Sequence, residues 1–184
     1  MTVFAVVLDS CVLYPMYLRD TLLCAAEAGL YQPYWTEEIL EGAFGNLIKD
    51  ERITPQKADS LYKLVNKAFP EAMIPVTPKL IPCMDNHEGD RHVLAAALIA
   101  KAQVIVSDNL KHFPESSLNQ FRVEAQSADT FLTFLWDLSP ETMVDVLRTQ
   151  VKGKKKPKLT ILDLLDRLKE QTPTLVQRYQ TFNQ

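Results

Sequence analysis

The sequence predicts an α/β fold with a central parallel sheet, and three observations lead to this prediction. The runs VFAVVL (3–8) and QVIVS (103–107) are rich in valine and isoleucine, which is typical of strands buried on both faces. Segments with the apolar spacing of helices alternate with the predicted strands. The length of 184 residues suits one domain, or one domain with an appendage.

The N-terminal half is predicted to contain two strands and three helices. Pro33 assigns the second strand to an edge of the sheet, because proline has no N–H to donate. Thr36 precedes one helix and Thr54-Pro55 opens the next, in positions where threonine caps a helix and proline is tolerated. The expected segments are a strand over 3–8, a helix over 17–30, a strand over 30–35, and helices over 37–49 and 54–69.

The following segment is predicted to complete the sheet. Its apolar helix and its second valine-rich strand have the clearest patterns. The expected segments are a brief strand over 73–76, a polar loop over 81–89, a helix over 90–101, a strand over 103–107, a short strand over 122–125 and a helix over 128–138.

We assign a core domain to residues 1–138 and a helical C-terminal extension to residues 139–184. In the extension, a helix to about Val151 precedes a basic linker over 152–158, and a last helix is expected over 175–182. The helix over 160–170 has leucine and isoleucine on one face. That face either packs on the chain's own core or binds a partner protein or a second subunit.

Composition excludes several classes of protein. With 47% hydrophobic and 23% charged residues, the chain is neither disordered nor rich enough in long apolar runs to span a membrane. Its start lacks the basic segment of a signal peptide, and three scattered cysteines form no CxxC pair, so we expect a cytoplasmic protein with reduced thiols. A net charge of −3 argues weakly against nucleic-acid binding through bulk charge.

Acidic residues are predicted to converge on one edge of the sheet. Asp9 and Asp108 follow the two buried strands, whose carboxyl ends share that edge in a parallel sheet. Asp90, Glu38 and Glu41 lie near the starts of helices that return to the same edge. Several carboxylates crowded together suit a hard cation such as Mg²⁺ or Mn²⁺, which activates water and stabilises charge in phosphodiester hydrolysis.

Each acid also has a structural interpretation. Asp90 is suited to cap its own helix, and Glu37 to complement the dipole of the helix that it begins. Asp108 followed by Asn109 is typical of a turn. Asp9 has the least structural reason for its position, since it ends a wholly apolar strand.

Other kinds of site are not indicated. The three histidines have no HxH or HExxH spacing, so no zinc site is expected. No GxGxxG, GxxxxGK[ST] or GxSxG motif occurs. Cys11 stands where a dehalogenase-like phosphatase would have a second aspartate, and we interpret it as a small buried residue.

Three segments together resemble the PIN-domain family, in particular the VapC-like toxins of bacterial toxin–antitoxin systems. They are VVLDSCVLYP (6–15), WTEEILEGAFGNL (35–47) and GDRHVLAAALIAKAQVIVSDNLKHFP (89–114), and the resemblance extends over about residues 3–135. It implies a parallel α/β/α sandwich and an Mg²⁺- or Mn²⁺-dependent endoribonuclease. It also implies inhibition by a cognate antitoxin and a homodimer.

The resemblance assigns three acids directly. Asp9 matches the first acid of the family, Glu41 the second, with Glu38 as a helper, and Asp90 the third.

The fourth acidic position departs from the family pattern. Where the family often has Thr-x-Asp, this chain has Ser107-Asp108-Asn109, so that strict register assigns Ser107 to the threonine and Asn109 to the acid. Either Asp108 substitutes for the missing acid, or the site has three carboxylates supported by Ser107 and Asn109.

Basic residues near the same edge are candidates for contacts with RNA phosphates. Arg19, Arg91 and Lys111 are the three nearest, and each is equally explained as ordinary surface charge. The lysines of 152–158 are the denser group, although such a run is usually solvated.

Two alternatives to a ribonuclease remain at this point. A non-catalytic PIN-fold module that binds RNA or protein would explain a degenerate fourth acid. A flap-type DNA nuclease would need helical additions for which the chain is short.

Overall fold

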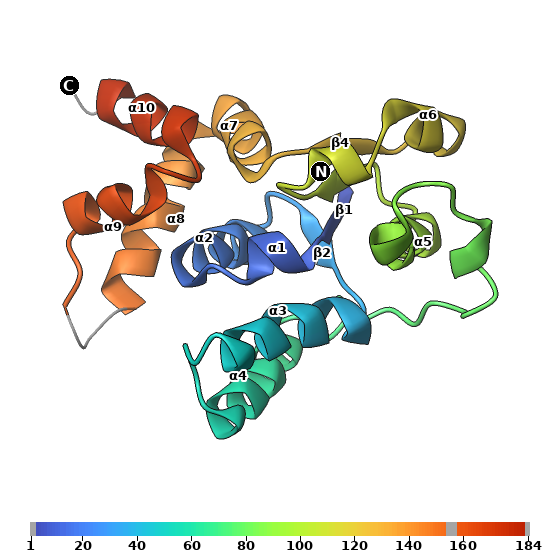
Figure 1. Cartoon of the computed structure of the whole chain (residues 1–184). Coiled ribbons are helices and arrows are strands. Elements are labelled where there is room, and N and C mark those ends of the chain that lie inside the picture. The colour runs from blue at the N-terminus through green and yellow to red at the C-terminus, as the bar shows by residue number, and fades with distance from the viewer. Residues whose placement is uncertain (1–2, 154–157, 183–184) are drawn as a thin grey trace.

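The computed structural model describes residues 3–153 and 158–182, and its centre is a four-stranded sheet in the order β2-β1-β3-β4 (Figure 1). All neighbouring strands are parallel. The strands are β1 (Ala5–Leu8), β2 (Gln32–Tyr34), β3 (Val104–Val106) and β4 (Glu124–Gln126). The α/β class and the parallel sheet predicted from the sequence are therefore confirmed.

Helices pack on both faces of this sheet, and in the described part of the chain three more helices follow α7 (Ala128–Leu138) at the C-terminal end. The predicted caps Thr36 and Thr54 are present, since their hydroxyls each accept an N–H in the first turn of the following helix, and Ser127 caps α7 in the same way. The α-helices are α1 (Ser10–Leu13), α2 (Met16–Glu27), α3 (Glu37–Lys49), α4 (Pro55–Ala68), α5 (Arg91–Ala100), α6 (Glu115–Leu118), α7 (Ala128–Leu138), α8 (Pro140–Gly153), α9 (Ile161–Leu168) and α10 (Pro173–Phe182). Short 3₁₀ turns span Ile81–Cys83, Glu88–Asp90, Leu110–His112 and Asn119–Phe121.

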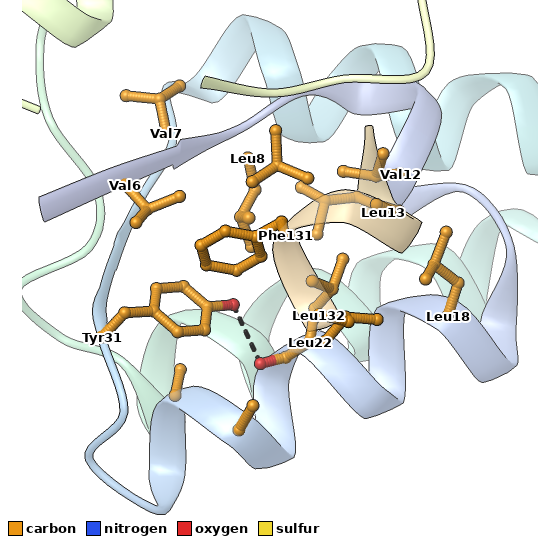
Figure 2. Close-up of a cluster of buried hydrophobic side chains, with 14 of the residues drawn as sticks. Val6, Val7, Leu8, Val12, Leu13, Leu18, Leu22, Tyr31, Phe131 and Leu132 are labelled. Carbon is orange, nitrogen blue, oxygen red and sulfur yellow. Dashed lines mark hydrogen bonds between the residues drawn. The ribbon is translucent and has the colours of Figure 1, made fainter. Parts of the chain in front are cut away.

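Strand β1 lies between β2 and β3, and both of its faces are covered. Val6, Val7 and Leu8 have no exposed surface, and successive side chains of a strand point to opposite faces. In Figure 2, Val6 and Val7 lie on opposite sides of β1. The Val6 side is closed by residues of α2 and α7 and by Tyr31, whose hydroxyl donates to the Leu22 carbonyl at 2.9 Å (Figure 2).

The edge position of Pro33 is confirmed, but the strand predicted over 73–76 is wrong. Pro33 lies in β2, which is the edge strand beside β1. Beyond β2, the residues that the structure describes form an isolated parallel bridge between Trp35 and Met73. Pro75 follows so closely that the chain cannot continue to donate hydrogen bonds to β2.

The C-terminal helices pack on the core instead of forming a separate body. They gather in Figure 1 on the side of the molecule away from α5 and α6, against α2 and α7. At the contact between α2 and α8, the buried Thr21 hydroxyl donates to Gln150 Oε1 at 2.8 Å. Leu164 and Leu168 of α9 have no exposed surface, so the apolar face of this helix packs within the chain, and its N-terminus carries a Thr160–Asp163 capping box.

The division at residue 138 stays a prediction, and one hydrophobic core includes buried residues from both sides of it. Lys152 lies in the last turn of α8, whereas residues 154–157 of the predicted basic linker lie outside the described residues. None of the helices described is both long and apolar enough to cross a membrane.

Candidate active site

Asp9 is a buried carboxylate at the carboxyl end of the central strand. Asp9 is only 1% exposed, and both of its carboxylate oxygens accept hydrogen bonds from uncharged groups. Oδ1 accepts from the Ser10 N–H at 2.6 Å and from the Ser10 hydroxyl at 3.2 Å. Oδ2 accepts from the Ser107 hydroxyl at 2.6 Å and from the Cys11 thiol at 3.3 Å.

The register of the sheet explains why Asp9 and Ser107 meet. Leu8 of β1 pairs with Val106 of β3, so the next residues of the two strands, Asp9 and Ser107, lie level with each other. Ser107 is completely buried, and its Oγ also accepts the N–H of Asn109 at 3.1 Å. Ser107 therefore fixes both the Asp9 carboxylate and the start of the following loop.

Cys11 belongs to this site, which the sequence did not indicate. Its thiol donates to Asp9 and lies 3.4 Å from Ser107 Oγ, while its sulfur accepts the N–H of Asp108 at 3.3 Å. Burial and the neighbouring Asp9 charge raise the pKa of the Cys11 thiol to about 12. The neutral thiol is thus a hydrogen-bond donor to Asp9 at neutral pH and not a nucleophile.

The carboxylate of Asp108 is engaged elsewhere. Asp108 lies one position beyond the level of Asp9, and its Oδ1 accepts the N–H of Ala128 at 3.1 Å, at the first residue of α7. Its side chain thus supports the N-terminus of a helix, as an acidic group there should. One oxygen of Asp108 is thus engaged at α7, and Asn109 beside it is exposed; which of the two fills the fourth acidic position stays a prediction.

Helix α3 brings two glutamates close to the loop that follows Asp9, and this edge of the sheet is called the rim below. A Cβ placed on Gly42 would lie 3.4 Å from Ser10 Cβ, so the first turns of α3 pass close to the Asp9 loop and Glu41 precedes this contact. Glu38, one turn earlier, has its Oε2 3.8 Å from Nδ1 of His92 in α5. Glu38, Glu41 and His92 line an open pocket of about 700 Å³, whose other wall is the segment from Met73 to Ile81.

Asp90 lies at the start of α5, two residues before His92, and its side chain does not cap that helix. Its Oδ2 lies 2.5 Å from Nδ1 of His112 and 4.0 Å from Nδ1 of His87. The absence of HxH and HExxH spacing therefore did not reveal that His87 and His112 meet at Asp90, and the expectation of no zinc site stays a prediction. The two histidines are 25 residues apart in sequence, so no local motif could reveal their contact.

The donor set around Asp9 fits a divalent cation. Within residues 3–153 and 158–182, no basic side chain forms an ion pair with Asp9, so its negative charge is buried without a positive partner. A buried charge of this kind is costly unless a cation or several strong donors offset it. Carboxylate oxygens from Asp9, Glu41 and Asp90 are the ligand type that Mg²⁺ and Mn²⁺ take.

The three carboxylates do not yet form a tight cluster. In the described part of the chain, the group of three ligand atoms within 4.8 Å of one another consists of His87, Asp90 and His112, and not of Asp9, Glu41 and Asp90. Glu41 is exposed, whereas Asp9 is buried and Asp90 is partly buried.

Arg19 does not fit the predicted role in RNA binding. It is 5% exposed, and its guanidinium donates to the carbonyl oxygens of Leu13 at 2.8 Å and Tyr14 at 3.3 Å. Burial lowers its pKa, with the nearby Asp20 opposing this effect. Arg19 therefore ties α1 to α2 instead of facing a phosphate, whereas Arg91 is partly exposed and Lys111 is exposed.

A model of the PIN domain matches residues 5–111, which is more than half of the chain. The chain belongs to the PIN-domain family. The matched range of this PIN domain contains Asp9, Glu41, Asp90 and the segment Ser107–Asn109. A second family model, the VapC50 C-terminal domain, matches residues 128–181, from the start of α7 to the last turn of α10.

A similar protein of Mycobacterium tuberculosis bears the name "Putative ribonuclease VapC50". It is 45% identical over 94 residues, which cover 51% of this chain and 56% of that protein. The matching segment thus spans little more than half of the relative's length. Together with the two family models, it supports a VapC-like PIN domain followed by helices of the VapC50 type.

Proposed function

We propose that the chain is a metal-dependent endoribonuclease that acts as the toxin of a toxin–antitoxin pair. The observation that carries this proposal is Asp9, a buried carboxylate at the carboxyl end of the central strand with no basic partner in the described residues, within a PIN domain. The name of the similar mycobacterial protein supports RNA as the substrate.

Asp9, Glu41 and Asp90 would hold Mg²⁺ or Mn²⁺, with Asn109 beside them as a neutral fourth group. When bound, such an ion supplies Lewis-acid stabilisation of charge on the phosphate and lowers the pKa of water. The chain's own groups prepare this site. The Ser10 N–H and the Ser107 hydroxyl orient the Asp9 carboxylate through hydrogen bonds of 2.6 Å each, to Oδ1 and Oδ2 respectively. The Cys11 thiol also donates to Oδ2.

RNA is expected to approach along the rim where Lys111 and Arg91 are exposed or partly exposed. These cations would contact phosphates flanking the cleaved bond. The remaining parts of the proposal are a cognate antitoxin as inhibitor, a homodimer, and action in the cytoplasm, where cellular RNA and an antitoxin would meet the enzyme.

The test is cleavage of a labelled single-stranded RNA by the purified chain with Mg²⁺ or Mn²⁺, beside Asp9→Asn. We expect wild-type cleavage that requires the cation and falls about 100-fold or more in the variant. Asp59→Asn, which changes an exposed aspartate of α4, is the matched control and should cleave like wild type. Cleavage that is indifferent to Asp9→Asn would refute the nuclease, and preferential cleavage of DNA in the same assay would refute the substrate.

A second candidate function rests on the fourth acidic position. Because Asn109 is neutral and Asp108 supports α7, this PIN domain has one carboxylate fewer than the family pattern. A module that binds RNA or protein without cleaving it would have this composition. RNA binding at micromolar protein with no cleavage in either cation would favour this function.

A further inference from the structure

A compact group of two histidines and one aspartate lies beside the candidate active site. Nδ1 of His112 and Nδ1 of His87 lie 2.5 Å and 4.0 Å from the same Asp90 oxygen. The two imidazole rings are stacked, with centroids 3.9 Å apart and an angle of 10° between their planes. All three ligand atoms lie within 4.8 Å of one another.

The backbone holds these three residues together independently of their side chains. The His87 N–H donates to the His112 carbonyl at 3.2 Å, and the Asp90 N–H donates to the His87 carbonyl at 2.9 Å. These bonds join the 3₁₀ turn before α5 to the turn that follows β3. The group is therefore positioned by the fold and not by chance contacts of flexible side chains.

One nitrogen of His87 acts as an acceptor, which is what a metal ligand must be. The N–H of Gly89 donates to Nδ1 of His87 at 3.3 Å, so this nitrogen carries a lone pair in that arrangement. His87 has 55% of its side chain exposed, whereas Asp90 and His112 expose 18% and 23%. The site is thus open to solvent on one side, with His87 free to adjust.

We propose that His87, Asp90 and His112 bind a late first-row transition-metal ion, for which Zn²⁺ is the probe. Two imidazoles with one carboxylate favour such ions, whereas Mg²⁺ prefers oxygen ligands alone. Three protein ligands at about 2.0–2.2 Å leave a fourth position for water, as in open zinc sites. The three ligand atoms lie within 4.8 Å of one another, which is close enough for one ion to bridge them.

Binding at this site has a consequence for the nuclease, which rests on the proposed function. Asp90 is one of the three carboxylates proposed to hold Mg²⁺ or Mn²⁺. An ion held by Asp90 and the two histidines occupies the Asp90 carboxylate, so Zn²⁺ would inhibit cleavage supported by Mg²⁺. The binding site itself does not depend on nuclease activity.

Calorimetric titration of the tag-free protein with Zn²⁺, in a large excess of Mg²⁺, tests the site. We expect one Zn²⁺ per chain and a loss of affinity of about tenfold or more in His112→Ala and in His87→Ala. The third histidine supplies the matched control, because His92 lies near the same helix start but outside the group, and His92→Ala should bind like wild type. Cys83→Ser, which removes an exposed thiol, should also bind like wild type. Wild-type affinity in His112→Ala, or displacement of Zn²⁺ by Mg²⁺, would overturn the proposal.

A measurement on the unaltered chain avoids any effect of substitution on folding. The three imidazoles give separate ring signals in NMR spectra, and Zn²⁺ should shift those of His87 and His112 and leave those of His92 unchanged. Shifts confined to His92 would contradict the site. Asp9→Asn separates the two proposals, since it should abolish cleavage and retain Zn²⁺ binding; a wild-type chain that binds Zn²⁺ in this way but cleaves nothing would refute the nuclease alone.

Discussion

At the scale of single residues, the order Ser107-Asp108-Asn109 shows how one position along a strand changes the role of a side chain. Ser107 lies level with Asp9 and donates to it at 2.6 Å. Asp108, the next residue, turns its carboxylate to the first N–H of α7. A hydroxyl thus orients the central carboxylate, while the acid beside it stabilises a helix.

Ser107 is expected to act as a positioning residue for Asp9. Ser107→Ala removes the 2.6 Å hydrogen bond, and we expect cleavage to fall about 10- to 100-fold and the Mg²⁺ concentration for half-maximal activity to rise. Ser117→Ala, at a similarly buried serine of α6, is the control for folding and should keep both values. Ser107→Thr retains the hydroxyl and should restore most of the loss. An unchanged Mg²⁺ requirement in Ser107→Ala would contradict this role.

Cys11 is expected to resist alkylation at neutral pH. Its pKa of about 12 lies above the ordinary value of 9.0, so the thiolate that reacts is scarce, and iodoacetamide should modify Cys11 about 100-fold or more slowly than the exposed Cys83 at pH 8. Because the pKa is raised in the folded state, the stability gained from the neutral thiol is complete below pH 9 and is lost as pH rises toward 12. Mass spectrometry of the labelled peptides measures the two rates, and equal rates would show that Cys11 is not held in this environment.

At the scale of elements, amphipathic patterning predicted where helices form, but not which segment covers the apolar face of each helix. The leucines of α9 indicated an apolar face, and both a core contact and a partner surface would have satisfied it. The structure buries Leu164 and Leu168 against the chain's own helices, while Leu162 on the other side is 72% exposed. A periodic pattern specifies which face is apolar but not what covers it.

A buried and an exposed leucine of α9 provide a matched test of this packing. Leu164→Ala removes a fully buried side chain and should lower the free energy of unfolding by about 2–5 kcal/mol. Leu162→Ala changes an exposed position of the same helix and should change it by less than about 0.5 kcal/mol. Urea unfolding followed by circular dichroism measures both. Equal effects would place the apolar face of α9 outside the core.

At the scale of the whole molecule, the C-terminal helices complete the hydrophobic core of the PIN domain. Helix α8 packs on α2, and α10 packs on α7. The carboxylate of Asp129 in α7 accepts the N–H groups of Thr174 and Leu175 at 3.0 and 3.1 Å, at the start of α10. The extension is therefore bound to the PIN domain by buried apolar and polar contacts.

A chain ending at Leu138 is expected to fold poorly. Truncation uncovers the sides of α2 and α7 that α8 and α10 cover, and it leaves the buried Thr21 hydroxyl without Gln150. We expect aggregation, or a thermal transition lowered by about 10 °C or more, when the truncated and full chains are compared by circular dichroism. A truncated chain as stable as the full one would instead support residues 1–138 as an independent domain.

The sequence by itself determined the α/β class, the parallel sheet and most of its strands and helices, although it also indicated a strand over 73–76 that is not formed; the shared edge of Asp9, Glu41 and Asp90 stays a prediction. These features follow from residue patterns of short range and from the rule that parallel strands end on one side. Only the tertiary structure decided that Asp108 supports α7, that Arg19 is buried, and that His87 and His112 meet at Asp90. The physical reason is that side-chain direction and contacts between distant segments depend on strand register and packing, which a local pattern does not contain.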